Sequence, residues 1–564
     1  MKKFYLIALL CFLIGSSISA QSFKWAKREG LYEYDYGYGM AHDNKGMVYV
    51  AGKYEQAANF SGTTLPNKGN HDIYVAQYDS MGNLKWIHTG GGPHGDYAHA
   101  MACNKTNAVY IAGEIEGFET VTFDDNTTTL TPQGENDAFV AKYDLSGTLL
   151  WAKSAGGVGN DKAQGVSYDA AGNVYITGKF TKTASFGGTS ITSAGAEDIF
   201  IAKYDANGNF LWVRSAGGPG LEEAQGMVCD ADGNSYICGR MSNGAMFGSN
   251  TAHTFHNTSF LDGFVAKYDK DGNALWVKTV GGDVDDDAWS IAQDEAGKIY
   301  ITGEYNAYAE FGGSTFALTS AGMADVFVAC FDASGTPQWA KTMGGKLIDR
   351  ARGITCSGSE VYITGQYGGT GAKFGSQTFD AADSSDVFVC GLDNTGNVKW
   401  TVVGGGAADA YEDLGFESGI AVTEDGNGSL YATGSLLDGG SFGGTSLSPY
   451  AHTDMFITRL ALSGALDHTG NGNGNSAITH MNGKGSFLVY PNPGKGTFRV
   501  SVPKTMEQDY QINVYNSLGQ LITNEAQKAS VQESTITLQN KGMYFIKILS
   551  KNGDYLDAQK LIVN

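Results

Sequence analysis

The feature that most constrains the fold of this chain is a unit of about 60 residues that recurs seven times. Each copy contains a tryptophan within a pattern such as "GNFLWVRSAGG", and successive tryptophans are 61 to 65 residues apart. Since one short unit cannot bury its own apolar face, the copies must pack against one another. The landmark residues are Trp25, Trp86, Trp151, Trp212, Trp276, Trp339 and Trp400.

One unit has the pattern of four strands. In residues 162–180, two runs rich in β-branched and aromatic residues flank "DAAGN", which is typical of a β-hairpin turn. After a long loop, "DIFIAKYD" and "FLWVRSAGG" are joined by a second turn, "ANGN". No segment keeps a 3.6-residue apolar period long enough to predict a helix.

The two ends of the repeat are complementary. Residues 22–30, "SFKWAKREG", copy the fourth strand although no unit precedes them, and the seventh unit ends in "ALDHTG" without a tryptophan. A strand from the N-terminus would supply what the last unit lacks and would leave no open sheet edge. We therefore predict an all-β fold: a seven-bladed β-propeller of four-stranded blades, closed by the N-terminal strand and followed by a small β-sandwich.

The repeats resemble the SBBP-type β-propeller repeats of bacterial surface proteins. The segments "DAAGNVYITGKF" and "FGG", with the pattern D-x-F-V-A-K-Y-D, carry this resemblance over roughly residues 22–467. The resemblance implies an architecture and no particular chemistry.

The first twenty residues have the pattern of a secretory signal peptide. Two lysines precede a short apolar run and a small-residue site, which predicts cleavage between Ala20 and Gln21. The apolar run is too short to span a bilayer, and no other stretch of the chain predicts a transmembrane segment. We expect residues 21–467 to form the propeller and the Gly/Asn-rich residues 468–484 to be a linker.

The last eighty residues, 485–564, change character and predict the strands of a small sandwich domain. Their motif residues are Tyr490, Pro491, Asn492, Pro493, Gly519, Gly542 and Tyr544. With these residues the segment resembles the type A C-terminal sorting domain of type IX secretion substrates in Bacteroidetes. This resemblance implies recognition by outer-membrane secretion machinery, and localisation at the cell surface or outside the cell after passage through the periplasm.

The charge of the chain excludes a class of partner. The net charge is −21, and residues 21–484 alone hold about −25 once the signal peptide and the basic tail are set aside. A surface this acidic repels phosphate backbones, so we expect no nucleic-acid partner. Six cysteines follow the signal peptide; Cys229 and Cys238 could pair, and we expect most of the six to be small apolar residues.

An acidic residue precedes the first strand of nearly every unit, and it has two interpretations. The carboxylates could surround a channel mouth and bind a cation such as Ca²⁺, or each could cap backbone N–H groups; repetition in every unit favours capping. The seventh unit departs, with Gly415 at the matching place and Asp413 nearby. The candidate residues are Asp35, Asp96, Asp161, Glu222, Asp286 and Asp349.

Two other groups could contact a ligand. Tyr32, Tyr34, Tyr36 and Tyr38 alternate along one segment, so they could stack on sugars or peptides at a rim, or pack inside as part of a strand. His94 and His99 could hold a metal, but no third ligand follows at a telling spacing. We expect no other cofactor.

These patterns favour an exported binding or adhesion module for an extracellular glycan or protein. We expect contacts through the long loops between second and third strands, or on the face of the "GGxGxD" turns. The alternatives are a secreted carbohydrate-active hydrolase or lyase, and a structural surface component. An enzyme would gather unmatched polar residues in one pocket, whereas a binding module would show aromatic or repeated polar groups across one face. The largest departure from the repeat is at residues 404–419.

Overall fold

A computed structural model describes most of the chain between Gln21 and Val563. The described residues form strands, turns and bends without a helix, so none of them provides a helix able to cross a membrane. The described ranges are 21–30, 34–123, 127–255, 260–313, 316–382, 384–406, 417–437, 440–447, 453–462, 488–490, 497–501, 510–516, 521–528, 533–550 and 555–563.

Each unit of the repeat contains antiparallel strands that pair in sequence order. The first unit is β2 (Tyr36–His42), β3 (Met47–Glu55), β6 (His71–Asp79) and β7 (Leu84–Gly91); the second is β8 (Asp96–Cys103), β9 (Ala108–Glu116), β12 (Asn136–Asp144) and β13 (Leu149–Gly157). The third is β14 (Lys162–Tyr168), β15 (Val174–Phe180), β18 (Asp198–Tyr204) and β19 (Phe210–Ala216); the fourth is β20 (Glu222–Cys229), β21 (Ser235–Met241), β24 (Asp262–Tyr268) and β25 (Ala274–Gly282). The fifth is β26 (Asp287–Gln293), β27 (Ile299–Phe311), β28 (Ala317–Phe331) and β29 (Pro337–Met343); the sixth is β30 (Arg350–Ser357), β31 (Glu360–Tyr367), β34 (Asp386–Asp393) and β35 (Val398–Gly405); the seventh has β36 (Ser418–Glu424), β37 (Ser429–Leu437) and β40 (Thr453–Ala461).

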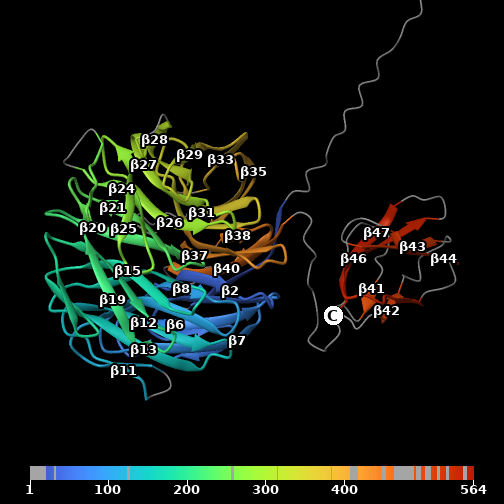
Figure 1. Cartoon of the computed structure of the whole chain (residues 1–564), viewed down its shortest axis with the longest axis horizontal. Helices are drawn as coiled ribbons and strands as arrows, with labels where there is room; N and C mark the ends of the chain where they lie inside the picture. Colours follow the sequence, from blue (N-terminus) through green and yellow to red (C-terminus); the bar gives the residue numbers. More distant parts are fainter. Residues whose placement is uncertain are drawn as a thin grey trace, which may run out of the picture.

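The first strands of the units lie next to one another around a common centre (Figure 1). Each contacts the first strand of the following unit, in the order β2, β8, β14, β20, β26, β30 and β36. Strand β36 also contacts β2, and the side chains of His42 and Thr423 form a 2.8 Å hydrogen bond there. The first and seventh units are therefore neighbours in space.

The N-terminal strand β1 (Ser22–Glu29) pairs antiparallel with β40 and forms the fourth strand of the sheet β1-β40-β37-β36. Its Trp25 donates a 3.0 Å hydrogen bond from Nε1 to the carbonyl of Ser80 in the first unit. Since β40 belongs to the seventh unit, β1 contacts both ends of the repeat.

The long loops between second and third strands fold into short hairpins, several of which pair with the preceding unit. In the β10 hairpin, Phe123 lies opposite Gly90 of β7, and a side chain at Gly90 would collide with the buried Phe123 ring. Part of these loops therefore packs against the preceding unit. The hairpin strands are β4 (Ala58–Phe60), β5 (Thr63–Leu65), β10 (Val121–Phe123), β11 (Thr129–Leu130), β16 (Thr183–Phe186), β17 (Thr189–Thr192), β22 (Met246–Phe247), β23 (Asn250–Thr251), β32 (Thr370–Phe374), β33 (Gln377–Asp380), β38 (Gly440–Phe442) and β39 (Thr445–Leu447).

The second and third strands carry the core. Strands β3 and β6 are buried along nearly their whole length, which fits strands covered on both faces. The fourth strands are more exposed, and most of their tryptophan rings are half-buried. The six cysteines of the described residues, Cys103, Cys229, Cys238, Cys330, Cys356 and Cys390, are free thiols, so the possible pairing of Cys229 with Cys238 is absent.

The tail forms two antiparallel sheets around a core that includes Phe498, Ile512 and Ile546. Tyr544 is buried and donates a hydrogen bond to the carbonyl of Asn540, and Gly542 begins β46. Tyr490 ends β41, while Pro491, Asn492, Pro493 and Gly519 lie outside the described residues, as does Ala20. The strands are β41 (Leu488–Tyr490), β42 (Thr497–Ser501), β43 (Tyr510–Asn516), β44 (Leu521–Gln527), β45 (Glu533–Thr537), β46 (Gly542–Ser550) and β47 (Tyr555–Val563).

Candidate functional site

Every first strand of the repeat contains a β-bulge at the same place. In β8, for example, Ala98 pairs with Gly113 and Ala100 pairs with Ala112, so His99 between them has no partner residue. A bulge of this kind re-aims the extra side chain and is common beside functional sites. We name the seven extra residues the bulge set: Tyr38, His99, Gln164, Gln225, Trp289, Arg352 and Ile420.

The predicted acidic residues lie three positions before the bulges and are buried. Asp161 is typical: its two carboxylate oxygens accept N–H groups from Gly157 at 2.8 Å and Thr181 at 3.1 Å. Asp96, Glu222, Asp286 and Asp349 accept two such bonds in the same way, and Asp35 accepts one from Glu55. This geometry matches the capping interpretation.

In the seventh unit, Glu417 occupies the corresponding position. It is buried, directly precedes β36, and accepts the N–H of Gly406 with both carboxylate oxygens. Gly415 and Asp413 lie outside the described residues. Glu417 was not predicted from the sequence, because the longer connection in this unit shifts the acid away from the place expected from the other units. The carboxylate set is therefore Asp35, Asp96, Asp161, Glu222, Asp286, Asp349 and Glu417.

A second buried carboxylate faces each member of this set from the start of a third strand. Asp137 and Asp161, for instance, both lie beside the Cα of Gly156. Burial, together with the neighbouring carboxylate, raises the pKa of Asp137 to about 7, and burial raises that of Asp161 to about 6. The second carboxylates are Asp72, Asp137, Asp198, Asp262, Asp325, Asp386 and Asp454.

The described residues contain no cluster of three or more His, Cys, Asp or Glu side chains arranged to hold a metal ion. His94 and His99 lie in separate contacts, with Glu119 and Glu114 respectively. The Ca²⁺ alternative thus stays a prediction, which titration can test.

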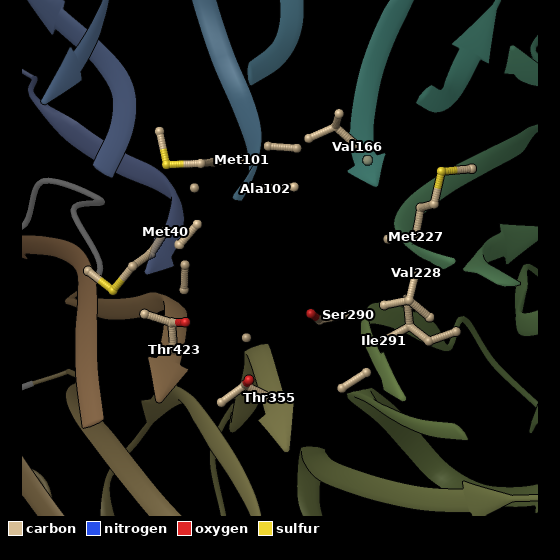
Figure 2. A pocket seen from close by; sticks show the side chains of 18 of the residues that line it. Met40, Met101, Ala102, Val166, Met227, Val228, Ser290, Ile291, Thr355 and Thr423 are labelled. Atoms are coloured by element: carbon tan, nitrogen blue, oxygen red, sulfur yellow. The ribbon is translucent and has the colours of Figure 1, made fainter. Parts of the chain in front are cut away.

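All seven first strands line one central cavity of about 540 Å³. Figure 2 shows its labelled side chains arranged around an open space, with Met40, Met101, Val166, Met227 and Ile291 among them. This middle layer of the channel is mainly apolar. The bulge set lies nearer the face where the first strands begin, which is also the face of the "GGxGxD" turns.

Unlike the carboxylate set, the bulge set differs from unit to unit, and six of its members make contacts in neighbouring pairs. The rings of Tyr38 and His99 are 5.4 Å apart. Gln164 donates a 2.9 Å hydrogen bond from Nε2 to Oε1 of Gln225. The guanidinium of Arg352 lies over the Trp289 ring, 4.6 Å from its centroid.

One of the predicted tyrosines, Tyr38, lines the cavity at this mouth of the channel. Tyr36 and Tyr38 are half-buried and stack on each other at 5.5 Å, and Tyr97 stacks on His99 at 5.6 Å. Burial raises the pKa of Tyr38, so its hydroxyl stays protonated near neutral pH. Tyr34 is exposed, and Tyr32 lies outside the described residues. The tyrosine segment is thus a strand whose rings line a rim.

Ion pairs hold several charged groups around this mouth. Burial alone would raise the pKa of Glu114, but its hydrogen bond with His99 and its ion pair with Lys162 lower it to about 2. Glu304 pairs with Arg350, and Glu223 pairs with Arg240 at 2.8 Å. Most of the bulge set was not predicted from the sequence. Its members can be recognised there as the variable residue three places after each repeated acid.

A family model decides the nature of the tail. It matches residues 488–564 and describes a secretion system C-terminal sorting domain. Residues 488–564 are a C-terminal sorting domain. This domain indicates export by type IX secretion to the cell surface or the extracellular space, and interaction with the secretion machinery.

Two curated proteins are distantly similar to this chain. It is similar to an uncharacterised WD repeat-containing protein of Acanthamoeba polyphaga mimivirus (22% identity; 73% of this chain, 36% of the relative). It is also similar to the regulatory protein FlaEY of Caulobacter vibrioides (26% identity; 64% of this chain, 39% of the relative). The chain thus spans less than two fifths of either relative.

Among solved structures, a variant of the apocarotenoid oxygenase of Synechocystis aligns with 77% of this chain and 97% of that chain. The identity is 12% and the TM-score is 0.32. The resemblance of the repeats to SBBP-type sequences remains a prediction.

Proposed function

We propose that the chain is an exported seven-bladed β-propeller that binds an extracellular ligand at one mouth of its central channel. The antiparallel pairing of β1 with β40 and the contact between β36 and β2 support a closed ring of blades. The sorting domain supports a role outside the cell. The protein then acts as a binding or adhesion module.

One observation carries the choice of site. A scaffold that repeats in every unit presents different side chains at the seven bulges, and these side chains face a cavity shared by all units. The acidic residue three places before each bulge is kept in every unit, whereas the bulge residue differs from unit to unit. Concave sites with a few polar groups among apolar and aromatic side chains are typical binding sites.

The test of binding is a glycan and protein array probed with the purified chain and with Trp289→Ala. We expect the wild type to retain a ligand that the variant loses. The matched control is Trp212→Ala, since Trp212 lies on β19, outside the cavity lining, and also carries an arginine on its ring. Equal binding by the wild type and Trp289→Ala would contradict the site.

The test of export is deletion of residues 488–564. We expect the shortened protein to accumulate in the periplasm, since the outer-membrane machinery would no longer recognise it. Normal surface display of the deletion protein would contradict this role of the tail.

A secreted hydrolase or lyase is the second candidate, because the unmatched polar side chains of the bulge set converge in one pocket. His99 and Tyr38 are adjacent and could exchange a proton with a bound sugar. Release of reducing or unsaturated sugar from a polysaccharide, lost in His99→Ala, would favour this candidate over a binding module.

A further inference from the structure

The cationic group at the channel mouth has an unusual environment. Arg352 is half-buried and lines the cavity, and within the described residues its guanidinium makes neither a hydrogen bond nor an ion pair. The nearby carboxylates are engaged elsewhere: Glu304 with Arg350, and Asp287 with Arg240 at 3.7 Å. Glu304 and Asp287 attract Arg352 from a longer distance. A partly buried charge without a hydrogen-bonded partner is unfavourable, so a ligand anion in direct contact would stabilise it.

The stacking of Arg352 selects the kind of anion. The guanidinium carbon of Arg352 lies over the Trp289 ring, and within the described residues the N–H donors of Arg352 make no hydrogen bond, so they can bind a ligand. A planar fork of donors matches a carboxylate, which can accept two parallel hydrogen bonds. The anion expected at this position is therefore a carboxylate.

Two polar groups near Arg352 can bind a ligand that both donates and accepts hydrogen bonds. Gln164 Oε1 and Trp289 Nε1 are buried and have no hydrogen-bond partner in the described part of the chain. The first can only accept and the second can only donate. Hydroxyl groups do both, so a ligand rich in hydroxyls satisfies this mouth.

The other side of the mouth is aromatic. Tyr38 and His99 line the cavity with their rings 5.4 Å apart. Tyr36 stacks on Tyr38 and Tyr97 stacks on His99 from outside the cavity lining, with Lys53 about 5 Å from the Tyr36 and Tyr97 ring centroids. Aromatic faces pack well on the apolar face of a sugar ring. A cavity of about 540 Å³ is of the size that holds small organic ligands.

We propose that the channel mouth binds an acidic saccharide, with the carboxylate of a uronic acid unit held by Arg352. This proposal rests on the proposed function, since it names the ligand class of the same site. A peptide carboxyl terminus shares the carboxylate but has fewer hydroxyls to satisfy Gln164 and Trp289.

Calorimetric titration of the purified full chain tests the proposal. The probes are trisaccharides of galacturonic acid and of glucuronic acid, their methyl esters, and a short peptide with a free carboxyl terminus. We expect at least one acid to bind, and esterification to weaken its binding about tenfold or more. Arg352→Met should lose binding to a similar extent, and Arg352→Lys should recover only part of it.

The control variant is Arg214→Met. Arg214 also lies over a tryptophan, 5.3 Å from the Trp212 centroid, but it already donates to two backbone carbonyls. Its removal should leave acid binding unchanged. Thermal unfolding verifies that each variant folds. If Arg352→Met does not fold, the binding measured with Arg352→Lys tests the role of Arg352 instead.

Three results would overturn the proposal: no acid binds, the esters bind as tightly as the acids, or the peptide binds more tightly than either acid. A neutral glycan or a protein retained by the wild type and lost in Trp289→Ala would still leave the proposed function standing. If no ligand of any class depends on Trp289, both fail.

Discussion

Two sets of side chains lie three residues apart, one at or just before the start of each first strand and one at its bulge, and they follow opposite rules. The carboxylate set is acidic in every unit, is buried, and accepts backbone N–H groups. The bulge set contains Tyr, His, Gln, Trp, Arg and Ile, and it faces a cavity.

The difference shows how a repeat separates scaffold from function. Each unit must satisfy its own backbone groups, so a capping residue is needed seven times. The central cavity is shared by all units, so each can contribute a different group to one ligand. Four experiments can test whether the carboxylate set and the bulge set have separate roles.

Deletion of residues 22–29 should have the largest effect. It removes β1, exposes the edge of β40 and breaks the contact of Trp25 with the first unit. We expect a lower melting temperature than for any single substitution, together with aggregation, measured by calorimetry and light scattering. A stable monomeric deletion protein would contradict the closed ring that brings both sets together.

Asp161→Ala and Gln164→Ala compare the two sets directly in the third unit, just before β14 and at its bulge. The first leaves two buried N–H groups without an acceptor, which should cost about 2 to 5 kcal/mol of unfolding free energy. The second removes one half-buried hydrogen bond and should cost about 1 kcal/mol or less. Chemical denaturation measures the unfolding free energy of both variants. Equal losses of unfolding free energy would contradict the distinction between the carboxylate set and the bulge set.

The stability of the protein should fall as pH rises from 6.5 to 9. Burial raises the pKa of Asp96 to about 8 and that of Asp286 to about 9, each opposed by backbone hydrogen bonds, from an ordinary 3.8. The folded state therefore holds protons that the unfolded state has released, and this stabilisation is lost as pH passes the folded pKa values.

Thermal unfolding across this pH range measures the effect, and Asp286→Asn should reduce the slope because the amide does not titrate. Gln225→Ala provides the control from the bulge set. An unchanged slope of stability against pH in Asp286→Asn would contradict the raised pKa of Asp286 as a cause of the pH dependence.

The smallest expected effect is that of calcium. If the carboxylate set only caps N–H groups, adding Ca²⁺ or a chelator should leave the melting temperature unchanged within about 1 °C. A clear rise with Ca²⁺, lost in Asp96→Asn, would instead support the cation alternative and give the carboxylate set a binding role.

Much of the site could not be read from the sequence, for identifiable reasons. The repeated acids were visible because they recur at a fixed place, yet Glu417 was hidden by the longer connection before it. Arg352 and Trp289 were not singled out, because the residue type at this position varies among the units and only the repeated acid three places before marks it. Their contact joins two strands from different units.

The strands, the turns, the repeat units and the sorting tail follow from local spacing and residue type, so they are visible in the sequence. Which side chains contact one another depends on the tertiary structure. Bulges turn one residue of each first strand toward the cavity, and the packing of the units brings His42 within 2.8 Å of Thr423, 381 residues away. Contacts between distant residues depend on how the strands pair and pack, and no local pattern records them.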